Sequence, residues 1–158
     1  MLSEEVIECF DRAVLCWLAS ADEQGRPSVS PKEIFVVTSP EELLIADIAS
    51  PRSVRNIGRR GAVCVAAIDV FEQRGYQVYG DARIVPATDP GFESLSEPLR
   101  AKAGPDFPIR SVIVVQVARF SPILAPSLWM FPDVSRSARR AGVLAAYGVR
   151  DAPSGGLA

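Results

Sequence analysis

The sequence predicts an α+β fold that is mainly β, with six antiparallel strands and flanking helices in a barrel or open sheet. Two observations predict it. Short apolar runs are separated by turn residues, as in strands joined by hairpins, and the helical patterns do not alternate regularly with the strands. The chain has 158 residues, of which 48% are hydrophobic, enough for one core but cramped for two. We therefore expect a single domain over residues 1–158.

The first part of the chain predicts a helix followed by a hairpin. Residues 1–13 place apolar side chains on one helical face, with two glutamates in the first turn. The runs Val14–Ser20 and Ser28–Val37 read as the first two strands, joined by a charged turn. Pro31 cannot donate to a sheet ladder, so the second strand is expected at an edge or bulged, and a bulge would reorient Lys32.

The middle of the chain predicts a strand, a helix and a central strand. Leu43–Ile48 reads as the third strand. In the helix that follows, Ser50 suits the N-cap, Pro51 the first helical position and Gly61 the end. The almost continuously apolar run Ala62–Asp69 indicates a strand covered on both faces.

The last part of the chain predicts two strands and two helices. Gly80 marks a bend or bulge in the fifth strand. Residues 122–158 form a C-terminal extension with a frayed tail over 151–158. The expected elements are a strand at Tyr76–Val85, a helix at Asp89–Lys102, a strand at Ser111–Phe120 and a helix at Ser135–Tyr147.

Missing residue types exclude several kinds of site. The chain has no histidine, which removes His-dependent catalytic triads, His-ligated metal centres and proximal-His haem. Cys9, Cys16 and Cys64 form no C-x-x-C pair, so we expect core thiols and no metal site. The sequence has neither a Rossmann nor a P-loop glycine motif. Its net charge of −2 argues against a nucleic-acid partner.

Two further observations predict a cytoplasmic protein without membrane contact. No apolar stretch approaches the ~18 residues of a membrane span. Glu4 and Glu5 stand where a secretory signal would carry basic residues.

One charge pattern points to a ligand. Arg52 falls in the first turn of the predicted helix, where the helix dipole disfavours a cation, and the sequence from Ile48 to Ile68 contains no acidic residue. A bound anion, most simply a phosphate, would resolve the conflict by accepting bonds from Ser50, Ser53 and backbone amides, with Lys32 as a second cation. The alternative is a surface arginine paired with Glu33 or Asp47. The residues alone support a bound anion and a surface ion pair about equally.

Three motifs resemble a known family. They are LASADEQGRPSVSPK (Leu18–Lys32), LLIADIASPRSVRNI (Leu43–Ile57) and RGYQVYGDARIV (Arg74–Val85), in matching order and spacing. They resemble the pyridoxamine 5′-phosphate oxidase-like family of FMN-binding split β-barrels. The resemblance implies a homodimer with an FMN at each of two interface sites.

The resemblance also implies site residues. The phosphate positions of the family fall on Ser50, Arg52 and Ser53, and Asn56 matches a position usually occupied by Asn. Pro51 replaces a basic residue of many members, so the site has one cation fewer. Ser30, Pro31 and Lys32 would lie along the flavin, and Ile45, Ala46 and Asp47 would present backbone to the ring and the ribityl chain. Trp129 would cover the partner's flavin, although core or interface packing is its alternative role.

The expected function is an FMN-dependent oxidoreductase acting on an unidentified small molecule. No residue stands out as a catalytic acid or base. The oxidase activity that names the family is disfavoured, because its C-terminal Arg and His set is not reproduced by Arg136, Arg139 and Arg140. The alternatives are a relative that binds the deazaflavin F420, a flavin-storage protein without turnover, and an interaction dimer with an empty cleft.

Overall fold

The computed structural model describes residues 1–104 and 106–151. Over these residues it contains seven strands and five helices. The strands are β1 (Cys16–Ala21), β2 (Pro27–Lys32), β3 (Phe35–Ser39), β4 (Glu42–Asp47), β5 (Ala62–Asp69), β6 (Arg74–Pro86) and β7 (Ser111–Leu124). The helices are α1 (Glu4–Arg12), α2 (Pro51–Arg59), α3 (Phe92–Ala103), α4 (Ser127–Met130) and α5 (Arg136–Tyr147).

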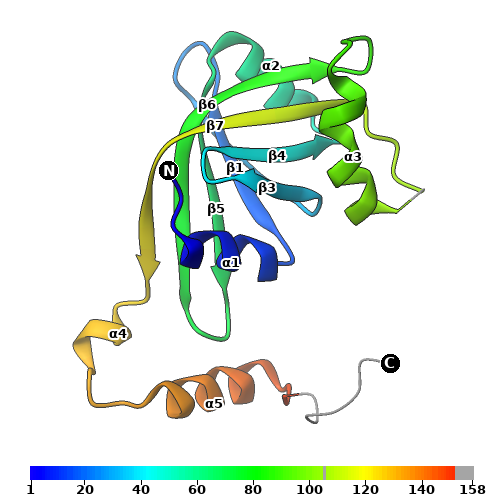
Figure 1. Ribbon diagram of the computed structural model, residues 1–158. Coiled ribbons are helices and arrows are strands. Elements are labelled where there is room, and N and C mark those ends of the chain that lie inside the picture. The colour runs from blue at the N-terminus through cyan, green and yellow to red at the C-terminus, as the bar shows by residue number, and fades with distance from the viewer. Residues whose placement is uncertain (105, 152–158) are drawn as a thin grey trace.

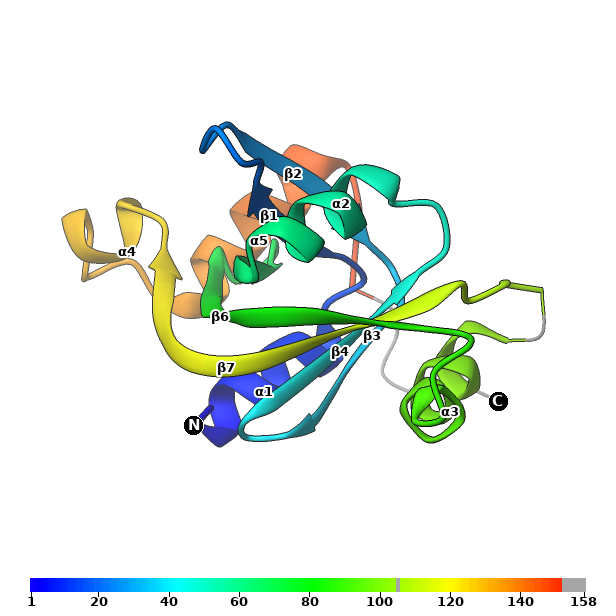
Figure 2. The same ribbon diagram turned by 90° about the horizontal axis from the view of Figure 1, so that it is seen from above.

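All seven strands form one antiparallel sheet in the order β2-β1-β5-β6-β7-β4-β3. The two edge strands, β2 and β3, are consecutive in the chain. The sheet therefore curls until its edges are joined by a short connection, as Figures 1 and 2 show from two directions. This is a barrel whose edges are not hydrogen-bonded to each other, so the predicted α+β class is confirmed.

The prediction of six strands is wrong by one. The run Ser28–Val37, expected as a single strand, divides at residues 33 and 34. Before the division Lys32 pairs with Cys16 of β1, and after it Phe35 pairs with Ile45 of β4. The edge position predicted for Pro31 is confirmed, and the β1–β2 register runs through it without a bulge.

Two apolar clusters hold the helices on the barrel. The larger fills the barrel and includes Val6 and Phe10 of α1. The smaller lies under α3 and includes Phe92 and Leu99. Together they bury apolar side chains of α1, α2 and α3, whereas α5 contributes to neither cluster.

The irregularity predicted at Gly80 is confirmed. The β6–β7 register shifts between Tyr79 and Gly80. A side chain at Gly80 would meet the backbone oxygen of Gln116 at 2.1 Å, so the two strands approach too closely there for any residue larger than glycine.

Two of the three thiols are core groups, as predicted. Cys9 and Cys16 are buried, whereas Cys64 is half-buried on the outer face of β5. Burial raises the pKa of Cys16 to about 12, so this thiol stays protonated and is a poor nucleophile at neutral pH.

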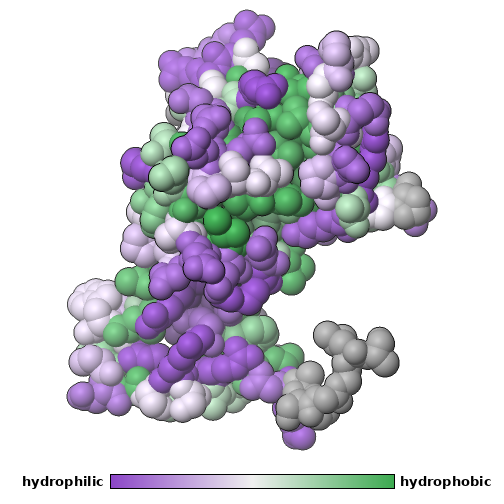
Figure 3. All heavy atoms as spheres, viewed as in Figure 1, coloured by the Kyte–Doolittle hydropathy of each residue, from purple (hydrophilic) through white to green (hydrophobic). Residues whose placement is uncertain are grey.

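The C-terminal arm, residues 124–151, leaves the barrel at the end of β7 (Figure 1). Glu72 in the β5–β6 turn forms ion pairs with Arg136 at 2.6 Å and Arg140 at 3.6 Å. In Figure 3 hydrophilic side chains predominate where the arm meets the barrel. The helix predicted at Ser135–Tyr147 is confirmed, with Ser135 as its N-cap. The frayed tail predicted over 151–158 lies, except for Asp151, outside the described residues.

None of the helices in residues 1–104 and 106–151 combines the length and the apolar character needed to cross a membrane.

Candidate functional site

The start of α2 leaves hydrogen-bond donors free. Pro51 occupies the first turn and Ser50 the N-cap, as predicted, but the Ser50 hydroxyl makes no capping bond. The backbone N–H groups of Arg52 and Ser53 have no acceptor within the helix, as is general for a first turn. The helix dipole adds partial positive charge at the same point, so this end of α2 favours an anion.

Lys32 reaches the same helix end from β2. Its side chain is only 5% exposed, and its Nζ donates to Ser50 Oγ at 2.5 Å. The backbone N–H of Ser50 donates to Asp47 Oδ1 at 2.9 Å, and the Ser111 hydroxyl donates to Asp47 Oδ2 at 3.0 Å. The buried carboxylate of Asp47 therefore accepts bonds on both oxygens and orders the N-cap against which Lys32 lies.

The charge of Lys32 is only partly balanced. Burial lowers its pKa, and the nearby negative charge of Asp47 opposes that effect. Among the described residues no carboxylate lies within 4.0 Å of the Lys32 ammonium. An ammonium has three donors, and one is used by Ser50. This buried cation can therefore bind a further acceptor.

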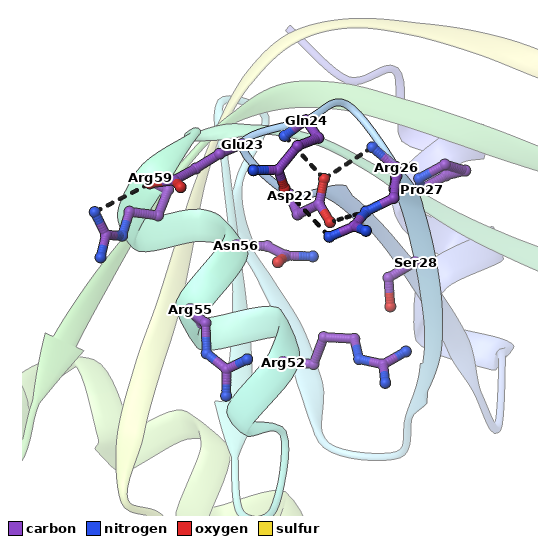
Figure 4. A pocket seen from close by; sticks show the side chains of 10 residues that line it. All are labelled: Asp22, Glu23, Gln24, Arg26, Pro27, Ser28, Arg52, Arg55, Asn56 and Arg59. Carbon is purple, nitrogen blue, oxygen red and sulfur yellow. Dashed lines mark hydrogen bonds and ion pairs between the residues drawn. The ribbon is translucent and has the colours of Figure 1, made fainter.

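The larger of two cavities beside the start of α2 has a volume of ≈ 520 Å³ and lies between α2 and the β1–β2 turn (Figure 4). Two of its four arginines are paired: Arg59 with Glu23 at 3.0 Å and Arg26 with Asp22 at 2.6 Å. Its lining residues are Asp22, Glu23, Gln24, Arg26, Pro27, Ser28, Arg52, Arg55, Asn56 and Arg59.

Arg52 and Arg55 line this cavity without a counter-charge. Within residues 1–104 and 106–151 neither forms an ion pair, so the alternative pairing of Arg52 with Glu33 or Asp47 is absent. Two guanidinium groups one helical turn apart can bind a phosphate by charge-assisted hydrogen bonds. Arg55 was not among the predicted site residues, although it lies in the same acid-free stretch as Arg52.

A second, more apolar pocket of ≈ 360 Å³ lies on the other flank of Ser50. Lys32 and Ser50 are two of its polar groups. Its other lining residues are Leu15, Pro31, Glu33, Ile34, Ala46, Ile48, Ala49 and Phe107. Because Ser50 lines this pocket and Arg52 lines the larger cavity, the start of α2 contributes to both.

The structure brings most of the predicted site residues to this place. The hydroxyls of Ser30 and Ser53 lie 3.1 Å apart, which joins β2 to α2. Asn56 lines the arginine cavity and is held by a 3.0 Å bond from its Nδ2 to Ser20 Oγ. Pro31 and Ala46 line the apolar pocket.

The side chains of two predicted residues, Ile45 and Trp129, line neither cavity. The side chain of Ile45 is fully buried in the barrel core, and the role predicted for Ile45, through its backbone, stays a prediction. Trp129 lies in α4, 68% exposed, and lines neither cavity.

Solved structures share this fold. The chain is similar to HupZ of Group A Streptococcus, with a TM-score of 0.68 and 18% identity over 79% of this chain and 96% of that one. An FMN-binding protein of Syntrophomonas wolfei matches with a TM-score of 0.63 and 12% identity over 77% of this chain and 88% of that one. An F420 reductase matches with a TM-score of 0.59 and 26% identity over 76% of this chain and 98% of that one. No curated protein sequence matches.

A family model described as pyridoxamine 5′-phosphate oxidase matches residues 2–123, which include both cavities and the whole barrel except the last residue of β7. The chain therefore belongs to the pyridoxamine 5′-phosphate oxidase-like family, with its split-barrel fold.

Proposed function

We propose that this protein binds FMN at the start of α2 and is an oxidoreductase acting on a small molecule. The phosphate binds to Arg52, Ser53 and the free N–H groups of the first turn, with Arg55 beside it. The ribityl chain passes Ser30 and Asn56, and the ring lies toward Lys32 and the apolar pocket.

The observation that carries this proposal is the unbalanced positive charge at one helix end. Arg52 and Arg55 on one flank, and buried Lys32 on the other, have no ion-pair partner among the described residues. A phosphate joined to an aromatic ring matches a polar cavity beside an apolar pocket.

The protein residues would supply position and electrostatics. Bound FMN supplies the electron and hydride transfer chemistry. Lys32 places a positive charge where the reduced ring would carry negative charge, and its pocket is lined mostly by apolar side chains that can contact the ring.

A visible absorption spectrum of the purified protein tests the proposal. We expect a yellow protein, or one that becomes yellow with added FMN, and bleaching by a chemical reductant. Bleaching by a small-molecule substrate would distinguish an enzyme from a flavin-storage protein. A colourless protein whose spectrum and thermal stability FMN does not change contradicts the proposal.

F420 is the second candidate cofactor. The 26% identity to an F420 reductase favours it, and the surplus arginines of the larger cavity suit a ligand with more negative charge than FMN. Parallel titrations with FMN and F420 decide between them by the relative affinities.

We also propose that the protein is a homodimer. The outer face of the sheet exposes apolar side chains: Trp17 is 44% exposed, and Val29 and Ile68 lie on the same face. A contiguous apolar sheet face is typical of an interface. We expect sedimentation at twice the 17.0 kDa chain mass.

Trp17→Glu should convert the dimer into a folded monomer, because it places a charge in the apolar face. Val14→Glu is the matched control, since Val14 is 84% exposed and precedes β1. Unchanged sedimentation of the Trp17 variant would place the interface on another face.

A further inference from the structure

We propose that Asp47 and Ser111 are positioning residues that hold the Lys32 ammonium at the wall of the apolar pocket. There its remaining N–H groups can bind the electron-rich edge of the cofactor ring. This inference rests on the proposed function for the identity of the ligand, but its structural part does not.

The contacts form a continuous chain from β7 to β2. Ser111 Oγ donates to Asp47 Oδ2, Asp47 Oδ1 accepts the N–H of Ser50, and Ser50 Oγ accepts from Lys32 Nζ. Ser111, Asp47 and Lys32 are each at least nine-tenths buried. A buried network of this kind fixes the positions of its members, because each polar group loses a partner if the next one moves.

The backbone of Asp47 is fixed as well. Its carbonyl accepts the N–H of Arg110 at 2.9 Å, and Asp47 pairs with Ser111 in the β4–β7 ladder. The Asp47 carboxylate is therefore held in place by β4 and β7. Its hydrogen bond to the Ser50 N–H in turn fixes the position of Ser50. Without the carboxylate, the N–H of Ser50 would lose its acceptor and the N-cap would be free to move.

Asp47 also supplies a negative charge that opposes the effect of burial on the pKa of Lys32. The groups that influence the charge of Lys32 are Asp47 on β4 and Cys16 on β1, and the exposed Glu33 lines the same pocket. Since Cys16 stays protonated, Asp47 is the buried anion whose charge opposes the lowering of the Lys32 pKa by burial. At more than 4.0 Å, it does so without occupying the donors that face the pocket.

Because the chain has few lysines, the effect of Asp47 and Ser111 on Lys32 can be measured in the protein without cofactor. Lys32 and Lys102 are the two lysines of the chain. In Lys102→Arg protein with labelled lysine, a single NMR signal therefore reports the titration of Lys32. We expect Asp47→Asn to shift this titration to lower pH, because the amide keeps an acceptor for Ser50 but removes the charge. Ser111→Ala should produce a smaller shift in the same direction.

Flavin binding provides the second measurement. We expect Asp47→Asn and Ser111→Ala each to weaken FMN binding about tenfold, the effect of one hydrogen bond to a charged group. Both should also lower the reduction potential of the bound flavin, because a displaced cation stabilises the reduced ring less. Ser121→Ala is the matched control: it removes a half-buried β7 hydroxyl that contacts Gln77 and is remote from this chain of contacts.

The outcomes separate the two proposals. If the wild-type protein binds FMN but neither variant changes the Lys32 titration, the FMN affinity or the potential, the positioning role is wrong and the proposed function stands. If the wild-type protein binds no flavin, the proposed function fails, and the Lys32 titration alone decides the positioning role. Chemical-shift maps of the variants show whether the barrel is retained.

Discussion

Replacing Arg52 by glutamate should abolish the thermal stabilisation that FMN gives the wild-type protein. A ligand present at 100 times its Kd adds about 2.7 kcal/mol to the free energy of unfolding, which for a domain of this size raises Tm by about 5–10 °C. The substitution reverses the charge at the wall of the larger cavity, where we propose that the phosphate binds. We therefore expect no FMN-dependent shift in a thermal melt of the variant.

The Arg52 variant should fold normally. Arg52 is exposed and forms no ion pair within the part of the chain that the structure describes. A glutamate in the first turn of α2 also interacts favourably with the helix dipole, so the Tm without ligand should stay the same or rise slightly. Arg83→Glu, an exposed β6 position that lines neither cavity, makes the same charge change and should keep the full shift. A full FMN shift in the Arg52 variant would place the phosphate elsewhere.

The second large effect is on stability. Gly80→Ala should lower the free energy of unfolding by about 3 kcal/mol or more, measured by urea denaturation. The new Cβ would lie 2.1 Å from the Gln116 oxygen and 3.0 Å from its carbonyl carbon, both backbone atoms. A side chain that met the new Cβ could rotate away, but these backbone atoms cannot. The strands β6 and β7 would therefore have to separate at Gly80, where their register shifts.

Gly58→Ala is the matched control and should have the opposite sign. Gly58 lies inside α2, and an added Cβ would have no other atom within 4 Å. Alanine restricts the unfolded chain more than glycine does, so a gain of about 0.5–1 kcal/mol is expected. Equal changes at the two positions would show that the close approach at Gly80 does not control stability.

Local rules predicted the start of α2 correctly. The predictions for Ser50, Pro51 and Arg52 used the residue preferences of the N-cap, the fixed φ of proline and the helix dipole, which concern only a few neighbouring residues. For the same reason Gly80 could be recognised as an irregular position before any strand partner was known. The family motifs also lie within short segments, and the family they indicated is confirmed by the match over residues 2–123.

The division of Ser28–Val37 could not be predicted in this way. Both halves are extended and carry similar residues, and only their partners differ: β1 for Lys32 and β4 for Phe35. Strand pairing depends on residues far apart in the chain. The two-residue alternation of a strand does not show which other strand is its partner. Arg55 was missed as a site residue because a helical arginine in an acid-free stretch does not by itself show whether it faces a cavity.

The sequence by itself determined the α+β class, the family and the helix end proposed as the anion site, because these depend on composition, on local propensity and on charges close together in the chain. Only the tertiary structure decided the number of strands, the burial of Lys32 and the chain of contacts from Ser111 to Ser50. Ser111 and Asp47 are 64 residues apart and meet because β4 and β7 pair. The position of the Lys32 side chain therefore depends on strand pairing, whose free energy comes from contacts across the whole sheet.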